Sequence, residues 1–194
     1  MSSRDLLRRA AEIASDYLEG LPKRPVGSKA TVEEMRDALA GPLPAEGESA
    51  DSVLESLARA ADPGIVATAG PRFFGFVVGG TLPVTVAADW LTSTWDQNAG
   101  LFVLSPANSV AEETAGGWLR ELFGLPDGAS VGFVTGCQAA NFSALAAARH
   151  ALSQRFGWDI EARGLYGAPE IEVVVGAEAH VTVHTALQML GLGR

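Results

Sequence analysis

The sequence has few of the residues that point to disulfides, membranes or nucleic acid. Its 194 residues include one cysteine, Cys137, so no disulfide forms within the chain, which fits a reducing, cytosolic setting. No apolar run approaches the roughly 18 residues that a membrane span requires, and residues 1–12 show no signal-peptide apolar core. The net charge of −9 disfavours nucleic acid. We therefore expect a cytoplasmic protein without membrane or nucleic-acid partners.

Lysine is nearly as scarce as cysteine. The only two, Lys23 and Lys29, lie close to the N-terminus, and the other basic residues apart from histidines are arginines. Apolar residues are abundant, at 47%, beside 19% charged residues. This composition is typical of a globular protein with a core.

The first 62 residues are expected to form a helical arm. Thr31 followed by Glu34 is a capping box at the start of one helix, and Asp62-Pro63-Gly64 marks the end of the arm. Short helices joined by Pro-rich links cannot build a large core alone, so the arm should pack on something else. Its helices are predicted over residues 4–19, 32–40 and 50–60.

Residues 63–194 follow the pattern of an α/β domain with a mostly parallel sheet flanked by helices. Two short β-prone runs, Val131–Val134 and Ile171–Val175, are each followed by a helical segment. Ligands of such sheets bind at the carboxyl ends of the strands, so the turns after both runs are expected to converge. Helices are predicted over 82–95, 109–123, 139–155 and 180–192, with a loop over 157–169.

The turn after the first β-prone run has the character of an anion site. Thr135–Gln138 is composed of small and polar residues and precedes an Ala-rich helix, whose first N–H groups lack internal partners and whose dipole favours an anion. Most turns between a strand and a helix bind no phosphate, however, and this one matches neither nucleotide-binding glycine fingerprint. The spacing alone leaves open both phosphate binding and a purely structural turn.

The cysteine and the histidines have alternative interpretations. A helix N-terminus can activate Cys137 as a nucleophile, but no base is evident near it, which favours a role as a small packing residue. His180 and His184 share a helix face at a spacing that can bind zinc, yet Val181 stands where the metalloprotease signature needs Glu. No metal is predicted, and His150 is expected to be solvated or to cap a helix.

Four stretches along the chain, taken together and in order, have a specific pattern. They are Pro71-Arg72-Phe73-Phe74, Ala88–Thr94, Ser105-Pro106-Ala107 with Glu112-Glu113, and Thr135–Asn141 with Ala179-His180. This pattern resembles the group II pyridoxal-phosphate-dependent amino-acid decarboxylases, the family of glutamate and aromatic-amino-acid decarboxylases. The likeness runs from about Arg24 to the last residue, with Gly70 in place of a family histidine.

The resemblance implies the first part of the large domain of a fold-type I transferase and pyridoxal 5′-phosphate (PLP) as cofactor. In this family, residues at the positions of Gly136, Cys137 and Gln138 hold the cofactor phosphate, largely through backbone N–H groups and the Gln138 side chain. His180 would stack on the pyridine ring and is the expected catalytic residue of the chain.

The resemblance also implies contacts with the substrate and with a second subunit. Thr81 lies near the family's substrate-carboxylate contact, although Gly79-Gly80 departs from the pattern there. Asn98 lies in a loop that reaches the neighbouring active site. Family members are homodimers whose N-terminal arms wrap around the partner, a role that suits residues 1–62.

One departure from the family bears on activity. The chemistry needs a lysine that binds the cofactor covalently and an Asp that holds the pyridine nitrogen, and both lie beyond the match to His180. Lys23 and Lys29 cannot replace that lysine. We therefore expect a fragment, inactive alone, of an enzyme that decarboxylates an L-amino acid. The alternatives are another PLP enzyme of this fold, such as an aminotransferase or cysteine desulfurase, and a non-catalytic binding or assembly module.

Overall fold

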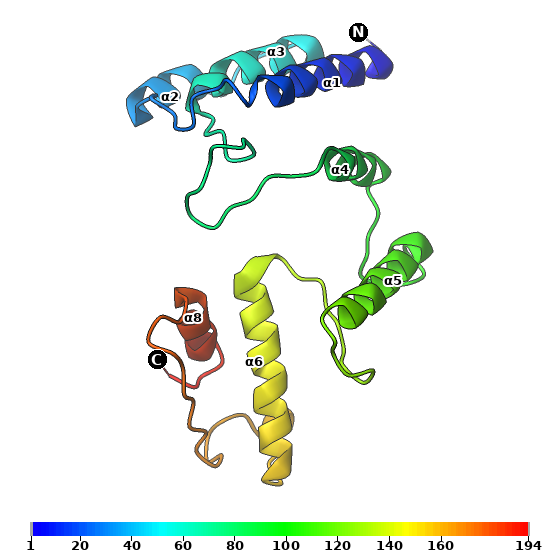
Figure 1. Cartoon of the computed structure of the whole chain (residues 1–194), viewed down its shortest axis with the longest axis vertical. Coiled ribbons are helices and arrows are strands. Elements are labelled where there is room, and N and C mark those ends of the chain that lie inside the picture. Colours follow the sequence, from blue (N-terminus) through cyan, green and yellow to red (C-terminus); the bar gives the residue numbers. More distant parts are fainter. Residues whose placement is uncertain (1, 194) are drawn as a thin grey trace. The chain divides into compact units, whose positions relative to one another are not determined.

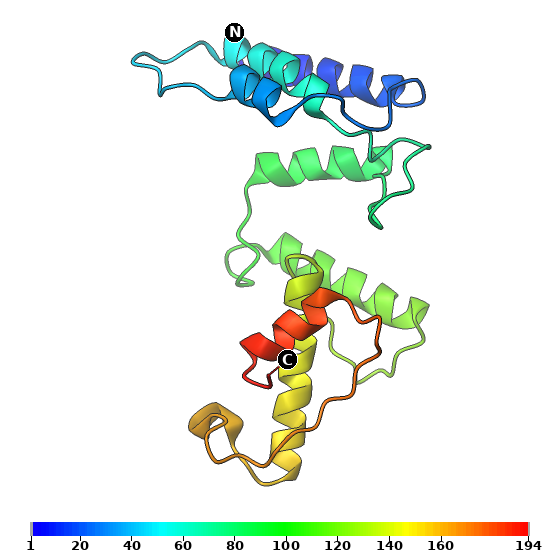
Figure 2. The same cartoon turned by 90° about the vertical axis from the view of Figure 1, so that its left-hand side faces the viewer.

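The structure is a computed structural model that describes residues 2–193, and its regular elements are helices (Figures 1 and 2). The chain forms two compact units, one up to Asp96 and one from Gln97 on. The domain boundary expected after residue 62 stays a prediction. The first unit contains α1 (Ser3–Gly20), α2 (Val32–Leu39), α3 (Ala50–Ala61), the 3-10 turn η1 (Asp62–Gly64) and α4 (Pro83–Trp95). The second contains α5 (Pro106–Leu122), α6 (Gly136–Arg155), α7 (Ile160–Arg163) and α8 (Val181–Met189).

The capping box predicted for α2 is confirmed. The Thr31 hydroxyl accepts a hydrogen bond from the Glu34 N–H at 3.1 Å, and the Glu34 carboxylate accepts one from the Thr31 N–H at 2.7 Å. The hydrogen bond from the Thr31 backbone holds the pKa of the Glu34 carboxyl below its ordinary value. Two backbone donors that the helix leaves unpaired are satisfied in this way, which explains why the start of α2 was predictable.

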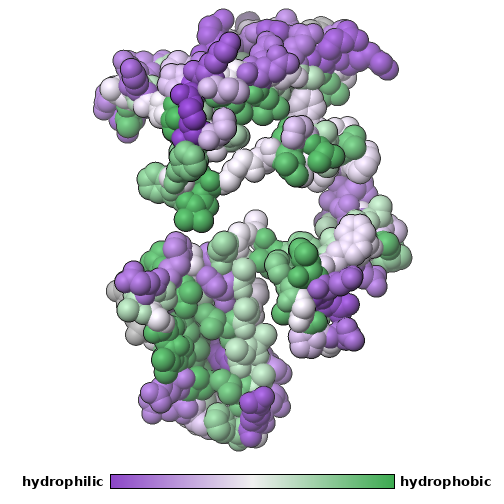
Figure 3. Space-filling model, in the orientation of Figure 1, coloured by the Kyte–Doolittle hydropathy of each residue, from purple (hydrophilic) through white to green (hydrophobic). Residues whose placement is uncertain are grey.

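Helices α1 to α3 pack without a buried core. None of the three contributes a buried residue, and Leu57 remains 57% exposed. The Arg9 guanidinium binds both oxygens of Glu55, joining α1 to α3, and this hydrogen bonding lowers the pKa of Glu55. Figure 3 shows hydrophilic side chains along the upper face of these helices. Leu21, directly after α1, is buried, and the role of residues 1–62 as an arm stays a prediction.

Helix α6 begins earlier than predicted, at Gly136 instead of residue 139. The turn Thr135–Gln138 therefore does not lie outside the helix but forms its entry and first turn. Gly136 has a positive φ of 78°, a conformation that glycine adopts without steric cost. Helix α5 also starts early, because the hydroxyl of buried Ser105 caps it, and α7 interrupts the loop predicted over 157–169.

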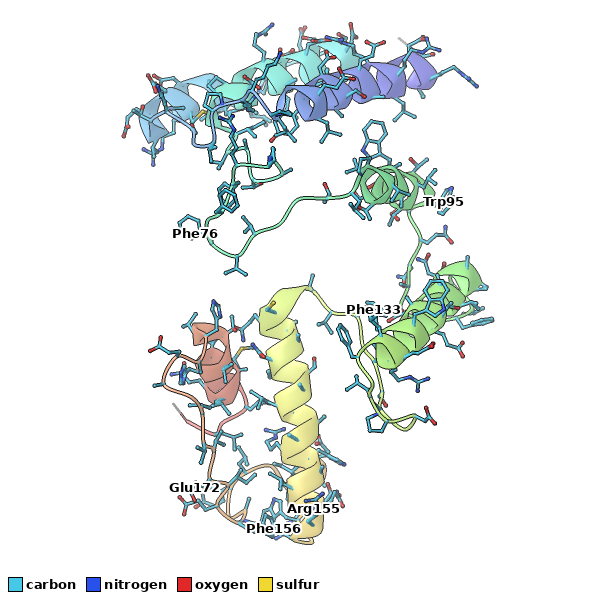
Figure 4. The ribbon with its side chains drawn as sticks, viewed as in Figure 1. Phe76, Trp95, Phe133, Arg155, Phe156 and Glu172 are labelled. Carbon is cyan, nitrogen blue, oxygen red and sulfur yellow. The ribbon has the colours of Figure 1, made fainter. Side chains whose placement is uncertain are left out.

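The two predicted strands are not formed. Between residues 2 and 193 no residue belongs to a β-strand, and Val131–Val134 and Ile171–Val175 run as unpaired chain. A β-prone run becomes a strand only when a neighbouring chain supplies the ladder of hydrogen bonds, and neither run has such a neighbour. In the second run, Val174 is 89% exposed. In the first run, Phe133 is 51% exposed and lies on the segment between α5 and α6 (Figure 4). The predicted parallel sheet is thus not confirmed.

The second unit is held together by the packing of α8 along α6 (Figures 1 and 2). On α8, Ala186 is fully buried, and Leu187 and Leu190 at its end are almost so. The many alanines of α6 let the two helices approach closely, and close packing is what makes such apolar contacts favourable. No helix among residues 2–193 has the length and apolar character of a membrane span.

Arg149 of α6 fixes the C-terminal end of α8. Its Nη1 donates to the carbonyl oxygen of Leu190 at 2.8 Å, and a cation at this position also complements the negative end of the helix dipole. The Nε of Arg149 is buried without a hydrogen-bond partner. The guanidinium is therefore held by one charged hydrogen bond to the end of the neighbouring helix.

Replacing Arg149 by methionine should loosen α8 from α6. The Arg149→Met change keeps an extended apolar side chain but removes the hydrogen bond to Leu190, and a hydrogen bond to a charged group contributes about 1.5–3 kcal/mol. Amide hydrogen exchange at Leu190, whose N–H donates to the Ala186 carbonyl, should become faster by a corresponding factor. Arg155→Met, at an exposed position of the same helix, is the control. Equal protection of Leu190 in both variants would contradict this role.

Candidate functional site

The N-terminus of α6 is open to a ligand. Alone among the α-helices of residues 2–193, α6 has neither a side-chain cap nor a proline in its first turn. The Gly136 N–H donates to the carbonyl of Val134 at 2.9 Å, while the N–H groups of the following residues have no acceptor within the helix. Gly136 and Cys137 are exposed. This end therefore offers free donors and the positive end of a long helix dipole.

A hydrogen-bond network joins this first turn of α6 to the start of α8. Asn141 Nδ2 donates to Thr182 Oγ1 at 2.8 Å, and Gln138 Nε2 donates to the Thr182 carbonyl at 3.4 Å. Thr182 Oγ1 in turn lies 2.9 Å from His180 Nδ1. The structure thus brings His180 together with the turn predicted to bind phosphate, through helix packing in place of the expected sheet.

His180 is the N-cap of α8, where the sequence predicted the first helical residue. Its Nδ1 accepts a hydrogen bond from the Thr182 N–H at 3.3 Å, a task that Ser, Thr, Asp or Asn usually performs. The side chain is exposed. The cap uses only Nδ1. The Nε2 edge of the imidazole makes no hydrogen bond to the described residues.

Gln138 has a structural task that the sequence did not indicate. Its side-chain amide, expected to hold an anion, is directed toward α8, where it also approaches the sulfur of Met189 at 4.0 Å. The backbone N–H of Gln138 belongs to the open first turn of α6. The side-chain amide of Gln138 is thus engaged by α8, and the predicted role of its backbone N–H in anion binding stays a prediction.

The two predicted substrate residues lie outside this network, each in its own local surroundings. Thr81 is exposed on the irregular segment before α4, in the first unit. Asn98 is exposed before α5, where its Oδ1 accepts the Gly100 N–H at 2.8 Å in a local turn. The roles of both residues stay predictions.

The other histidines and the cysteine considered in the sequence analysis take no part in the network around Thr182. His150 Nδ1 lies 3.1 Å from Glu161 Oε1, which links α6 to α7. His184 is half-buried on α8, and Cys137 is a free, exposed thiol. Within residues 2–193, no group of three or more His, Cys, Asp or Glu side chains is arranged to hold a metal ion.

Sequence reasoning assigned no role to Thr182, Asn141 or Arg149. The signal was present in α6, because Gln138, Asn141 and Arg149 recur at helical spacing on an alanine-rich helix. Polar residues on such a face need partners when a second helix covers it. Thr182 had no such signal, because threonine is common near helix starts.

The arrangement suits a ligand with an anionic group attached to a flat ring. The open N–H groups and helix dipole of α6 attract the anion, and the exposed imidazole of His180 is available to stack on a ring. Gly136 has open space where a Cβ would stand, with no atom within 4 Å of that position. A phosphate can therefore approach the backbone without displacing a side chain.

Comparison with known proteins identifies relatives over nearly the whole chain. The aromatic-L-amino-acid decarboxylase of Bacillus atrophaeus is 29% identical over 188 residues, 97% of this chain and 37% of that protein. The human acidic amino acid decarboxylase GADL1 is 28% identical over 160 residues, 82% of this chain and 28% of that protein. The chain therefore spans well under half the length of these relatives.

Solved structures show the same similarity in three dimensions. Mouse CSAD in its apo form superposes with a TM-score of 0.86 at 28% identity, covering 98% of this chain and 40% of that one. Oryza sativa TDC with PLP gives a TM-score of 0.82 at 25% identity, covering 97% of this chain and 41% of that one.

The model of the pyridoxal-dependent decarboxylase conserved domain matches residues 33–193. The cofactor of this family is pyridoxal 5′-phosphate, whose phosphate and pyridine ring correspond to the anionic group and flat ring that the site suits. The match includes the open end of α6, the network through Thr182 and His180, so the chain belongs to the pyridoxal-dependent decarboxylase family.

Proposed function

We propose that these residues supply the phosphate-binding part of an enzyme that uses PLP to decarboxylate an L-amino acid. The observation that carries the proposal is the open, small-residue first turn of α6, held by hydrogen bonds beside the segment that carries His180. The family match supports the chemistry. Since the chain spans only part of each relative, the activity is proposed for the protein to which these residues contribute.

The phosphate would be held at the N-terminus of α6. The backbone N–H groups of Cys137 and Gln138 are placed to donate to it, with Gly136 providing the close approach. A doubly charged phosphate gains from the dipole of a long helix, and such contacts typically contribute about 0.3–1 kcal/mol per charge at exposed sites. Cys137 serves here as a small residue, without a nucleophilic role.

His180 would position the cofactor ring. Its Nδ1 is engaged by Thr182, so the imidazole is fixed as a flat apolar surface beside the anion site. Stacked aromatic pairs contribute about 0.5–1.5 kcal/mol beyond the area that they bury. His180 thereby touches the cofactor, which is the sense in which we assign it a catalytic role.

The cofactor supplies the electron sink that accepts the electron pair left when the carboxylate departs as CO₂. The residues of this chain would bind and orient the cofactor. The two lysines of the chain, Lys23 and Lys29, precede the match to the family, whereas the family resemblance places the lysine for covalent attachment beyond His180. We therefore propose that the 194 residues alone do not catalyse decarboxylation.

We extend the proposal to the substrate, the second subunit, the sheet and the cellular location. Two curated relatives are an aromatic and an acidic amino acid decarboxylase, so we assign the substrate only as an L-amino acid. Thr81 and Asn98 are proposed to contact substrate, the second across a homodimer interface wrapped by residues 1–62. The exposed runs Val131–Val134 and Ile171–Val175 are proposed to join a parallel sheet in the whole protein, which we propose to be cytoplasmic.

In the whole protein, His180→Ala should weaken PLP binding by about threefold to tenfold, the loss expected for one stacking contact, and should slow CO₂ release. His184→Ala, on the same helix but half-buried and away from the cap, should change both by less than about twofold. Cofactor dissociation and CO₂ release from acidic and aromatic L-amino acids measure these effects. Equal losses restored by zinc would contradict stacking, and amino-group transfer without CO₂ would indicate an aminotransferase.

The isolated chain should form no specific covalent adduct with PLP. Borohydride reduction after incubation with PLP, followed by peptide mapping, should find only scattered, substoichiometric labelling of Lys23 and Lys29, because neither stands at the position of the family's cofactor lysine, which lies beyond His180. Lys23→Arg and Lys29→Arg variants are the controls for that background. A single stoichiometric adduct accompanied by CO₂ release would overturn the proposal that the chain alone is inactive.

A further inference from the structure

We propose that Thr182, held in place by Asn141, is a positioning residue that sets the tautomer of His180: the neutral imidazole carries its proton on Nε2 and not on Nδ1. The meaning of this tautomer for catalysis rests on the function proposed above. The tautomer itself is a property of the chain without cofactor.

The backbone N–H of Thr182 provides the first argument. It lies 3.3 Å from His180 Nδ1 and closes the N-cap of α8. A backbone N–H can only donate, so the nitrogen that it meets must present a lone pair. A neutral imidazole has one protonated and one unprotonated nitrogen, which places the proton on Nε2.

The hydroxyl of Thr182 provides the second argument. A threonine hydroxyl has one donor hydrogen and two acceptor lone pairs. Asn141 Nδ2 donates to Thr182 Oγ1 at 2.8 Å and occupies one lone pair. Because Nδ1 of His180 already accepts from the Thr182 N–H and carries no hydrogen, the 2.9 Å contact between Thr182 Oγ1 and Nδ1 needs the hydroxyl hydrogen. The chain of donors therefore runs from Asn141 through Thr182 to His180, and both donors of Thr182 meet the same nitrogen.

The relay also couples two parts of the site. Asn141 and Gln138 both belong to the first turns of α6 and both hold Thr182, one at its side chain and one at its carbonyl. The orientation of the His180 ring is thus tied to the helix whose open end would bind the phosphate. A neutral ring with its N–H directed away from Thr182 can stack on a cationic pyridine ring without like-charge repulsion.

The tautomer can be read directly from long-range ¹H–¹⁵N spectra of the full 194-residue chain labelled in the imidazole. Spectra are recorded at a pH above which the imidazole shifts no longer change, so that only the neutral ring contributes. His150→Gln and His184→Gln variants assign the His180 signals. The expected result is an unprotonated nitrogen shift at Nδ1 and a protonated one at Nε2.

Variants then separate the relay from the fold. Thr182→Val removes the hydroxyl and should lower the ratio of Nε2–H to Nδ1–H tautomer about fivefold, the loss of one hydrogen bond of about 1 kcal/mol. Asn141→Asp should shift it in the same direction, because a carboxylate only accepts and draws the Thr182 hydroxyl toward itself. Thr182→Ser should retain the wild-type ratio. Thr185→Val, which breaks only a local bond to the Val181 carbonyl, should leave it unchanged.

A wild-type spectrum dominated by the Nδ1–H form, or a Thr182→Val ratio equal to that of Thr185→Val, would overturn the proposal. Failure of PLP binding or of decarboxylation would instead overturn the proposed function and leave the tautomer result standing. The two hypotheses are therefore tested by separate measurements.

Discussion

The contact between α6 and α8 is the constraint on which the site depends. It consists of a small apolar seam, with Ala186, Leu187 and Leu190 buried against an alanine-rich helix, and of polar contacts at both ends. Asn141 and Gln138 hold the start of α8, and Arg149 holds its end. Apolar contacts have no directional preference, so the polar contacts at the two ends fix the register of α8 against α6. That register places His180 beside the open end of α6.

The sequence predicted the helices well where their ends are local events. The capping box of Thr31 and Glu34 depends only on neighbouring residues, and it is found. The start of α6 was misplaced because Gly136 enters the helix through a positive φ that composition does not reveal. The predicted strands required partners far away in the chain, and β-propensity cannot supply those partners. Residues such as Val174 therefore remain exposed.

The sequence suggested which residues belong to the candidate site, but not the contacts that join those residues. The small-residue turn and His180 could be selected from the sequence because helix ends and histidines have recognisable chemistry. The contacts that join the turn to His180 could not be predicted from the sequence, because Thr182 and Asn141 act through tertiary hydrogen bonds. The family match over residues 33–193 and the TM-score of 0.86 with mouse CSAD show the family and its fold, and the roles of the selected residues stay proposals. The chain spans about two fifths of that neighbour, so the activity is assigned to the whole protein as a proposal.

The central claim is that the first turn of α6 holds the phosphate of PLP. A crystal structure of the whole protein with PLP bound tests this most directly. The account predicts phosphate oxygens within hydrogen-bonding distance of the backbone N–H groups of Cys137 and Gln138, with the imidazole of His180 parallel to the pyridine ring. A phosphate bound elsewhere, with these N–H groups contacting only water or protein, would contradict the account.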